Sequence, residues 1–179
     1  MTEPTRQDFA CMASVFASRE PEQLPIHFRL GTRVIDGIPA DFQSERTYSY
    51  ADANILRYEY TGVSPEGLEV RLTETEYRDF PVREWTATFR NCGKTNSPIV
   101  SDIRLGGVIE GADPCFVHGT GDTCGDDGYT WFTDPVTAET RVIYPDDGTS
   151  CHGAAPYMQL LFRDHAIRIG IGYPAMWQV

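Results

Sequence analysis

Basic side chains and long apolar runs are both scarce in this chain of 179 residues. Lysine and arginine together number 15 against 26 for aspartate and glutamate, so the formal net charge is -11 and the isoelectric point lies near 4.7. Nucleic acids and anionic membranes are bound through clustered basic side chains, which argues against both as partners. The sequence has no run of about 18 apolar residues that could span a bilayer, and residues 1–10 lack the apolar segment of a signal peptide. We therefore expect a soluble, cytoplasmic protein.

Cysteine pairs with the spacing of a zinc site are absent. The number of cysteines is odd, and the chain is long enough to bury a sizeable core without disulfides, so we expect reduced thiols. Neither CxxC nor CxxxxC occurs, and Asp122, Asp126 and Asp127 lack the spacing of an EF-hand. The cysteines are Cys11, Cys92, Cys115, Cys124 and Cys151. The sequence predicts neither a metal ion nor a cofactor.

Helical periodicity is weak and is confined to the first 20 residues. Its apolar positions are Phe9, Met12, Val15 and Phe16. This spacing predicts either a short helix or a lead-in that packs on a sheet. We assign residues 1–25 to this segment and residues 26–179 to a β-sandwich domain.

The clearest pattern runs from Leu68 to Asn91. Apolar and polar residues alternate through its first half. A corner at residues 78–81, which contains a proline, follows, and the alternation then resumes. A period of two residues is typical of a half-buried antiparallel strand, and proline suits a corner because it lacks an N–H. The residues expected to face the core are Leu68, Val70, Leu72, Trp85, Ala87 and Phe89. The sequence therefore predicts a long β-hairpin.

Shorter strands are predicted on both sides of this hairpin. The first begins at Ile26 and ends at Gly31 or at the Asp36-Gly37 turn. Residues 106–128 have few apolar side chains and are expected to form a long irregular segment. The other strand candidates are residues 55–61, 99–105, 129–132, 141–144, 157–162 and 166–172, the last two as a hairpin. Many short strands with little helix indicate an all-β fold, an antiparallel β-sandwich.

Two adjacent acid pairs, Asp126-Asp127 and Asp146-Asp147, stand beside glycines. Glycoside hydrolysis uses two carboxyl groups about 5 to 9.5 Å apart. Adjacent residues of an extended chain point to opposite faces, so neither pair can supply both groups by itself. Turn formation beside glycine accounts for both pairs and is the favoured interpretation.

Histidines and tryptophans in the predicted loops are the remaining candidates. The loop histidines are His118, His152 and His165. They could join Ser150 or Cys151 in a nucleophilic site, but no Gly-x-Ser-x-Gly elbow is present, which favours hydrogen-bonded loop histidines. Trp131 and Trp177 follow glycine-rich turns, where an aromatic face could stack on a sugar or pack in the core.

Four motifs follow one another along the chain. They are E-Y-R-D-F-P-V-R-E-W at 76–85 with F-R-N-C-G at 89–93, H-G-T-G-D-T-C-G-D-D at 118–127, S-C-H-G-A-A-P-Y at 150–157 and I-G-I-G-Y-P-A-M-W at 169–177. Together they resemble the N-terminal β-supersandwich domain of family 36 glycoside hydrolases, the α-galactosidase group. His152 stands where that family usually has asparagine.

This resemblance implies a galactose-mutarotase-like supersandwich and a retaining glycosidase acting on α-galactosides. The family's catalytic aspartates lie in a separate (β/α)8 barrel, and the strand–helix alternation of such a barrel is absent here, so no catalytic residue is expected in this chain. The chain is expected to support the barrel of the same protein and to lend a loop to its sugar site. The residues expected at the rim of that site are Asp126, Asp127, Trp131 and His152.

Two other functions fit the same fold. The first is a stand-alone carbohydrate-binding module, for which exposed aromatic side chains on one sheet face would be the distinguishing feature. The second is a structural or oligomerisation domain without a ligand, and the sequence leaves homo-oligomerisation open. Fold alone does not decide among these functions, because unrelated activities share one architecture.

Overall fold

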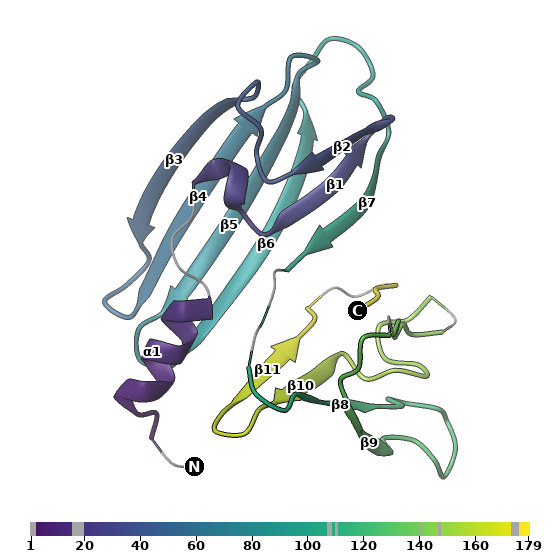
Figure 1. Cartoon of the computed structure of the whole chain (residues 1–179). Helices are drawn as coiled ribbons and strands as arrows, with labels where there is room; N and C mark the ends of the chain where they lie inside the picture. Colours follow the sequence, from purple (N-terminus) through teal and green to yellow (C-terminus); the bar gives the residue numbers. More distant parts are fainter. Residues whose placement is uncertain are drawn as a thin grey trace. The chain divides into compact units, whose positions relative to one another are not determined.

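The computed structural model describes residues 3–15, 20–106, 109, 111–139, 141–146, 148–172 and 176–179. The chain forms two compact units, Met1–Ile109 and Glu110–Val179 (Figure 1). Phe16 of the helical pattern, Asp147 of the second acid pair and residues 173–175 of the fourth motif lie outside the described residues.

The N-terminal segment contains helix α1, Arg6–Val15, and the short 3-10 helix η1, Pro21–Gln23. Thr5 and Asp8 cap the start of α1 reciprocally. The Thr5 hydroxyl oxygen accepts from the Asp8 N–H at 3.3 Å, and Asp8 Oδ2 accepts from the Thr5 N–H at 2.7 Å. This is a capping box, and it satisfies amide groups that the first helical turn leaves without partners.

The larger sheet of the first unit is an antiparallel meander of four strands, β3-β4-β5-β6 (Figure 1). Its strands are β3 (Gln43–Tyr50), β4 (Ile55–Val63), β5 (Leu68–Tyr77) and β6 (Val82–Asn91). Strands β5 and β6 pair without interruption from Leu68↔Asn91 to Tyr77↔Val82. The predicted hairpin and its corner at residues 78–81 are therefore confirmed.

The smaller sheet of this unit has the order β2-β1-β7. Its strands are β1 (Ile26–Leu30), β2 (Arg33–Asp36) and β7 (Val100–Leu105). Gly31 has a φ of +60° at the turn between β1 and β2, a left-handed conformation that glycine adopts without strain. The chain therefore turns at both predicted places. It turns at Gly31 after β1, and it then pairs with β1 again as β2, which ends at Asp36.

The core of the first unit consists of apolar side chains from both of its sheets. Phe28 of β1 and Phe89 of β6 meet edge to face with their ring centroids 5.1 Å apart. Trp85, Ala87 and Phe89 are half-buried and pack against the fully buried members. The buried core residues are Leu24, Ile26, Phe28, Leu30, Ile35, Ile38, Phe42, Tyr60, Leu68, Val70 and Leu72. The all-β sandwich predicted from the sequence is confirmed.

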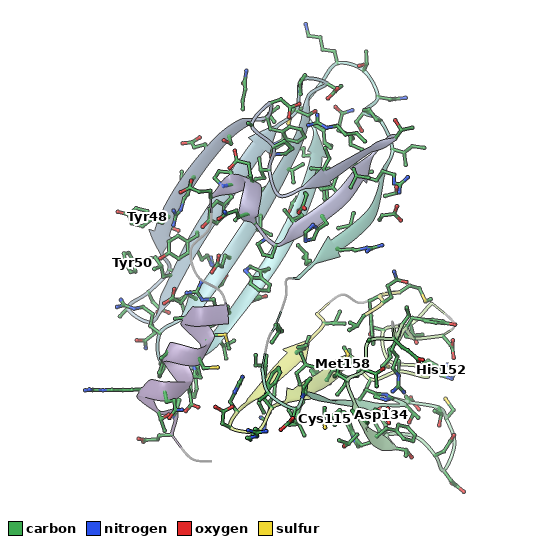
Figure 2. All side chains as sticks on the ribbon, in the orientation of Figure 1. Tyr48, Tyr50, Cys115, Asp134, His152 and Met158 are labelled. Carbon is green, nitrogen blue, oxygen red and sulfur yellow. The ribbon has the colours of Figure 1, made fainter. Side chains whose placement is uncertain are left out.

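The sequence did not predict β3, whose residues read Q-S-E-R-T-Y-S-Y and are all exposed. No apolar alternation marks such a strand, because neither of its faces is buried against a core. Its stability comes from pairing with β4 and from Arg46, whose guanidinium lies 5.3 Å from the ring centroids of both Tyr58 and Tyr60. Figure 2 shows Tyr48 and Tyr50 on this strand.

The inner face of the large sheet also contains charged residues. Glu74 follows Leu72 on this face and is only 6% exposed. Arg83 of β6 forms ion pairs with Glu74 and, at 3.1 Å, with Glu76. A buried carboxylate requires such partners, since an unpaired buried charge costs several kcal/mol.

The second unit is built on a four-stranded antiparallel sheet of order β11-β10-β8-β9. Its strands are β8 (Cys115–Gly119), β9 (Trp131–Pro135), β10 (Tyr157–Leu161) and β11 (Ala166–Gly170). The predicted C-terminal hairpin is confirmed by pairing from Tyr157↔Gly170 to Leu161↔Ala166. Met158 and Ile167, from its two strands, are buried.

Three expectations for the second unit need correction. Residues 106–128 are not wholly irregular, because β8 lies within them. The strand expected at 129–132 begins two residues later, since Tyr129 has a φ of +59°, which a β-strand does not accommodate. Residues 141–144 form no strand, although Ile143 and Val179 exchange two backbone hydrogen bonds of 2.9 Å.

Replacement of Leu72 by alanine tests the core of the first unit. Leu72 is 0% exposed, so Leu72→Ala is expected to lower the free energy of unfolding by about 2 to 5 kcal/mol. Thr86→Ala on the solvent face of β6 is the control and is expected to change it by no more than about 0.5 kcal/mol. Urea denaturation of both variants measures the change in the free energy of unfolding. Equal changes would contradict the assignment of Leu72 to the core face and of Thr86 to the solvent face.

Candidate functional site

One end of the sheet in the second unit collects the segments that the sequence singled out. At this end β8 stops at Gly119, β9 starts at Trp131 and β10 starts at Tyr157. The second motif continues from β8 into the connection 120–130, and the third motif leads into β10. Connections at the ends of strands are free to carry functional side chains, because the sheet fixes where they begin and end.

The connection 120–130 is closed at its base by hydrogen bonds of its own. The Thr120 N–H donates to the Thr130 carbonyl at 3.0 Å, and the Tyr129 N–H donates to the Gly121 carbonyl at 2.6 Å. The hydroxyls of Thr120 and Thr130 both donate to the carbonyl of Asp127, at 3.0 and 2.8 Å. The backbone of the loop is therefore held in one shape by its own side chains.

The aspartates of this loop differ in their surroundings. Asp127 Oδ1 accepts from the Thr123 hydroxyl at 2.8 Å, and Asp122 Oδ1 accepts from the Cys124 N–H at 2.9 Å. These two carboxylates thus cap the loop's own polar groups, as turn aspartates commonly do. Asp126 and Asp127 are both exposed to solvent.

His152 of the third motif, labelled in Figure 2, lies directly beside Asp122 of the second motif. It forms a parallel β-bridge with Asp122, in which the Asp122 N–H donates to the Cys151 carbonyl at 2.8 Å and the Gly153 N–H donates to the Asp122 carbonyl at 3.2 Å. The His152 N–H donates to the Thr149 hydroxyl at 3.1 Å. The half-buried His152 is therefore fixed through its backbone.

Gly121 allows the two motifs to approach this closely. Its φ is +67°, and a Cβ at this position would lie 2.1 Å from the carbonyl oxygen of Cys151. Any side chain here would force the two segments apart, since real Cβ contacts are never that short. The fourth motif reaches the same region, because Trp177 Nε1 donates to the Ser150 carbonyl at 2.9 Å.

Trp131 stands at the start of β9 with half of its surface exposed, 50%. Its ring lies over Gly119 of β8, where a Cβ would approach Cδ2 and Cε3 to 3.2 Å. The structure thus brings Asp126, Asp127, Trp131 and His152 to one end of the sheet. Neighbouring Tyr157, which is 67% exposed, was not among the predicted site residues.

The other two histidines predicted in loops have carboxylate partners instead of Ser150 or Cys151. His118 lies in strand β8 and not in a loop, so that part of the prediction is wrong. His118 Nε2 lies 3.0 Å from Asp134 Oδ2, and His165 Nδ1 lies 2.8 Å from Asp164 Oδ1. The His118 ring stacks between Phe116 and Phe132, with centroids 5.6 and 5.4 Å away. Both histidines are therefore hydrogen-bonded, as expected, and each has an aspartate as its partner.

The residues described contain no cluster of three or more His, Cys, Asp or Glu arranged to hold a metal ion. Cys92, Cys115, Cys124 and Cys151 are free thiols. Among the described helices, none has both the length and the apolar character that crossing a membrane requires.

Comparison with known proteins identifies the fold. No protein-family model matches the sequence, and no curated protein matches it. Among solved structures, the GH36 α-galactosidase AgaB from Geobacillus stearothermophilus superposes with a TM-score of 0.61 at 16% identity over 89% of this chain. AgaA from the same organism, alone and as a variant in complex with stachyose, superposes with a TM-score of 0.58 at 19% identity over 86% of this chain.

This chain has the fold of one part of a family 36 α-galactosidase. It spans 24% of the AgaB chain and 21% of the AgaA chain. The resemblance drawn from the four motifs is therefore confirmed as a likeness of fold.

The Asp134 carboxylate gives the second unit a predictable response to acid. The hydrogen bond from His118, followed by that from Arg141, holds the pKa of Asp134 below its ordinary value of 3.8. A carboxyl group whose pKa is lower in the folded than in the unfolded protein stabilises the fold. This stabilisation is complete when the pH is above the pKa of the unfolded protein, and it is lost as the pH falls through the pKa of the folded protein. We expect Asp134→Asn to be less stable than wild type near pH 6, and the difference to shrink as the pH falls below 3.8 through the lowered pKa of Asp134. A difference between the melting curves that stays constant over this range would contradict the assignment.

Proposed function

We propose that this chain is a non-catalytic, N-terminal domain of an α-galactosidase-like retaining glycoside hydrolase. In this proposal the domain supports a (β/α)8 catalytic barrel of the same protein and lends the loop 122–131 to the site that holds the α-galactoside. Retaining hydrolysis needs a nucleophile and a general acid. The barrel supplies both, and the sandwich supplies surface and positioning.

The observation that carries the proposal is the shared fold. Between 86% and 89% of this chain superposes on α-galactosidases, of which it covers only 21% to 24%. The described strands form open antiparallel sheets, unlike the parallel barrel that performs this chemistry. An accessory domain is the function that agrees with both facts.

The hydrogen bonds divide the proposed rim residues into two roles. Asp127 is engaged with Thr123, and His152 is held by its bridge to Asp122, so these two residues position the loop. Asp126 and Trp131 are exposed on it. A carboxylate that accepts from sugar hydroxyls and an aromatic face that contacts the ring carbons are what a sugar site requires.

A stand-alone carbohydrate-binding module is the second candidate. The specific observation in its favour is the pair of exposed aromatic side chains, Trp131 and Tyr157, at the same end of one sheet. Such a module would bind sugar without a barrel, whereas the first proposal requires one. The two proposals agree that the partner is a carbohydrate.

Replacement of Asp126 in the enzyme that joins this domain to its barrel tests the proposed rim. Asp126→Asn is expected to lower kcat/KM for an aryl α-galactoside about 3- to 10-fold, the contribution of one hydrogen bond, with the melting temperature unchanged. Asp79→Asn, at the exposed corner of the β5–β6 hairpin, is the control and should leave both quantities unchanged. A lower melting temperature with wild-type kinetics would show that Asp126 serves only the loop.

A further inference from the structure

Two pairs that each join a glycine to an aromatic residue lie at the same end of the sheet of the second unit. Gly170 of β11 pairs with Tyr157 of β10, and Gly119 of β8 pairs with Trp131 of β9. Gln159, two residues from Tyr157 on β10, pairs with Val117, two residues from Gly119 on β8, and residues two apart along a strand share a face. Directly paired residues of an antiparallel sheet point to the same face, so both aromatic rings lie on one side.

Both rings lie over glycines instead of standing upright. A Cβ on Gly119 would meet the Trp131 ring at 3.2 Å, and a Cβ on Gly170 would meet the Tyr157 ring at 3.7 Å. Each ring therefore covers the neighbouring strand and leaves its other face to solvent, which is why both residues remain at least half exposed. Strands lie about 4.8 Å apart, so the two aromatic residues are about 10 Å apart across the sheet.

Polar side chains complete the same face. Gln159 and Arg168 pair with each other one step along the strands from Tyr157 and Gly170, so they share the face of the two aromatic residues. Together these residues line a hollow of about 130 Å³. Pockets for drug-sized ligands measure about 300 to 1,000 Å³, so this hollow suits a single small ring.

A neutral sugar matches this combination of groups. One side of a pyranose ring presents C–H groups, which pack on an aromatic face, and its edge presents hydroxyls. The Gln159 amide both donates and accepts hydrogen bonds, and the Arg168 guanidinium offers several N–H donors. A purely apolar ligand would leave both groups without partners, whereas hydroxyls supply them.

We propose that Trp131, Tyr157, Gln159 and Arg168 form a saccharide-binding platform that takes one neutral pyranose ring. Trp131 and Tyr157 supply the stacking surfaces, and Gln159 and Arg168 bind the hydroxyls. The platform itself rests on this geometry and requires no barrel, whereas the choice of an α-galactoside as its ligand rests on the proposed function.

Nuclear magnetic resonance titration of the isotope-labelled chain tests the platform directly. The chain has three tryptophans, and Trp131→Phe assigns the Trp131 indole signal. Addition of methyl α-D-galactopyranoside is expected to shift this signal saturably while the Trp85 signal, from the core of the first unit, stays in place. Parallel titrations use methyl α-D-glucopyranoside and anionic galacturonate.

Variants separate stacking from a merely structural role. Tyr157→Ala is expected to weaken binding about tenfold, whereas Tyr157→Phe retains it, since stacking needs the ring and not the hydroxyl. Tyr48→Ala, an equally exposed tyrosine on β3, is the control and leaves affinity unchanged. If Tyr157→Ala does not fold, Arg168→Ala replaces it as the test variant. The Arg168 side chain is exposed, so its removal opens no core. This variant is likewise expected to weaken binding about tenfold.

The outcomes also distinguish this inference from the proposed function. If the glucoside saturates the Trp131 signal and the galactoside does not, the platform stands and the α-galactoside assignment fails. If neither neutral glycoside shifts Trp131, or if only galacturonate does, the platform is overturned. Wild-type affinity in Tyr157→Ala or, where that variant does not fold, in Arg168→Ala would overturn it as well.

Discussion

Burial of one face of β5 is the constraint on which the first unit depends. Leu68, Val70 and Leu72 alternate with polar residues, and each is at most 2% exposed. Because successive side chains of a strand point to opposite faces, a shift of one residue would move all three into solvent. This fixes the pairing of β5 with β4 and β6, and with it the corner that carries the first motif.

Close backbone approach has the same importance in the second unit. The second and third motifs meet where Gly121 passes the carbonyl of Cys151, and no residue with a Cβ fits there. Buried Ala154 and Ala155 follow in the third motif. The glycine and alanine positions of these motifs therefore serve packing, which leaves the exposed Asp126 and Trp131 free to meet a ligand.

The parts of the fold that the sequence predicts are those where one face of a strand is buried. The β5–β6 hairpin, β1 and the C-terminal hairpin show this alternation, whereas β7 was also predicted although its residues 102–105 are exposed. Strand β3 does not show the alternation, because it is exposed along its whole length, and the short β8 was obscured by the glycines and aspartates around it. The alternation of apolar and polar residues indicates that one face of a strand is buried. A strand that is stabilised mainly by pairing with its neighbours lacks this alternation.

The candidate site could be predicted only in part, for a related reason. Motifs indicated the loop 122–131 and His152, but only the pairing of β10, β8 and β9 reveals that Tyr157 and Trp131 lie on one face of the sheet. Likewise, the capping role of Asp127 depends on Thr123, a contact within the loop that composition does not show. The pairing of segments that are distant in the sequence is set by the whole fold, so it cannot be predicted from any single stretch of residues.

The most direct test of the central proposal, that this chain is an accessory domain and the catalytic groups lie elsewhere in the enzyme, is an activity measurement on the purified chain. Incubated with an aryl α-galactoside, residues 1–179 are expected to release the aryl group no faster than buffer alone. Turnover above that rate, abolished by substitution of a single carboxylate in this chain, would contradict the account and place the chemistry in the sandwich itself.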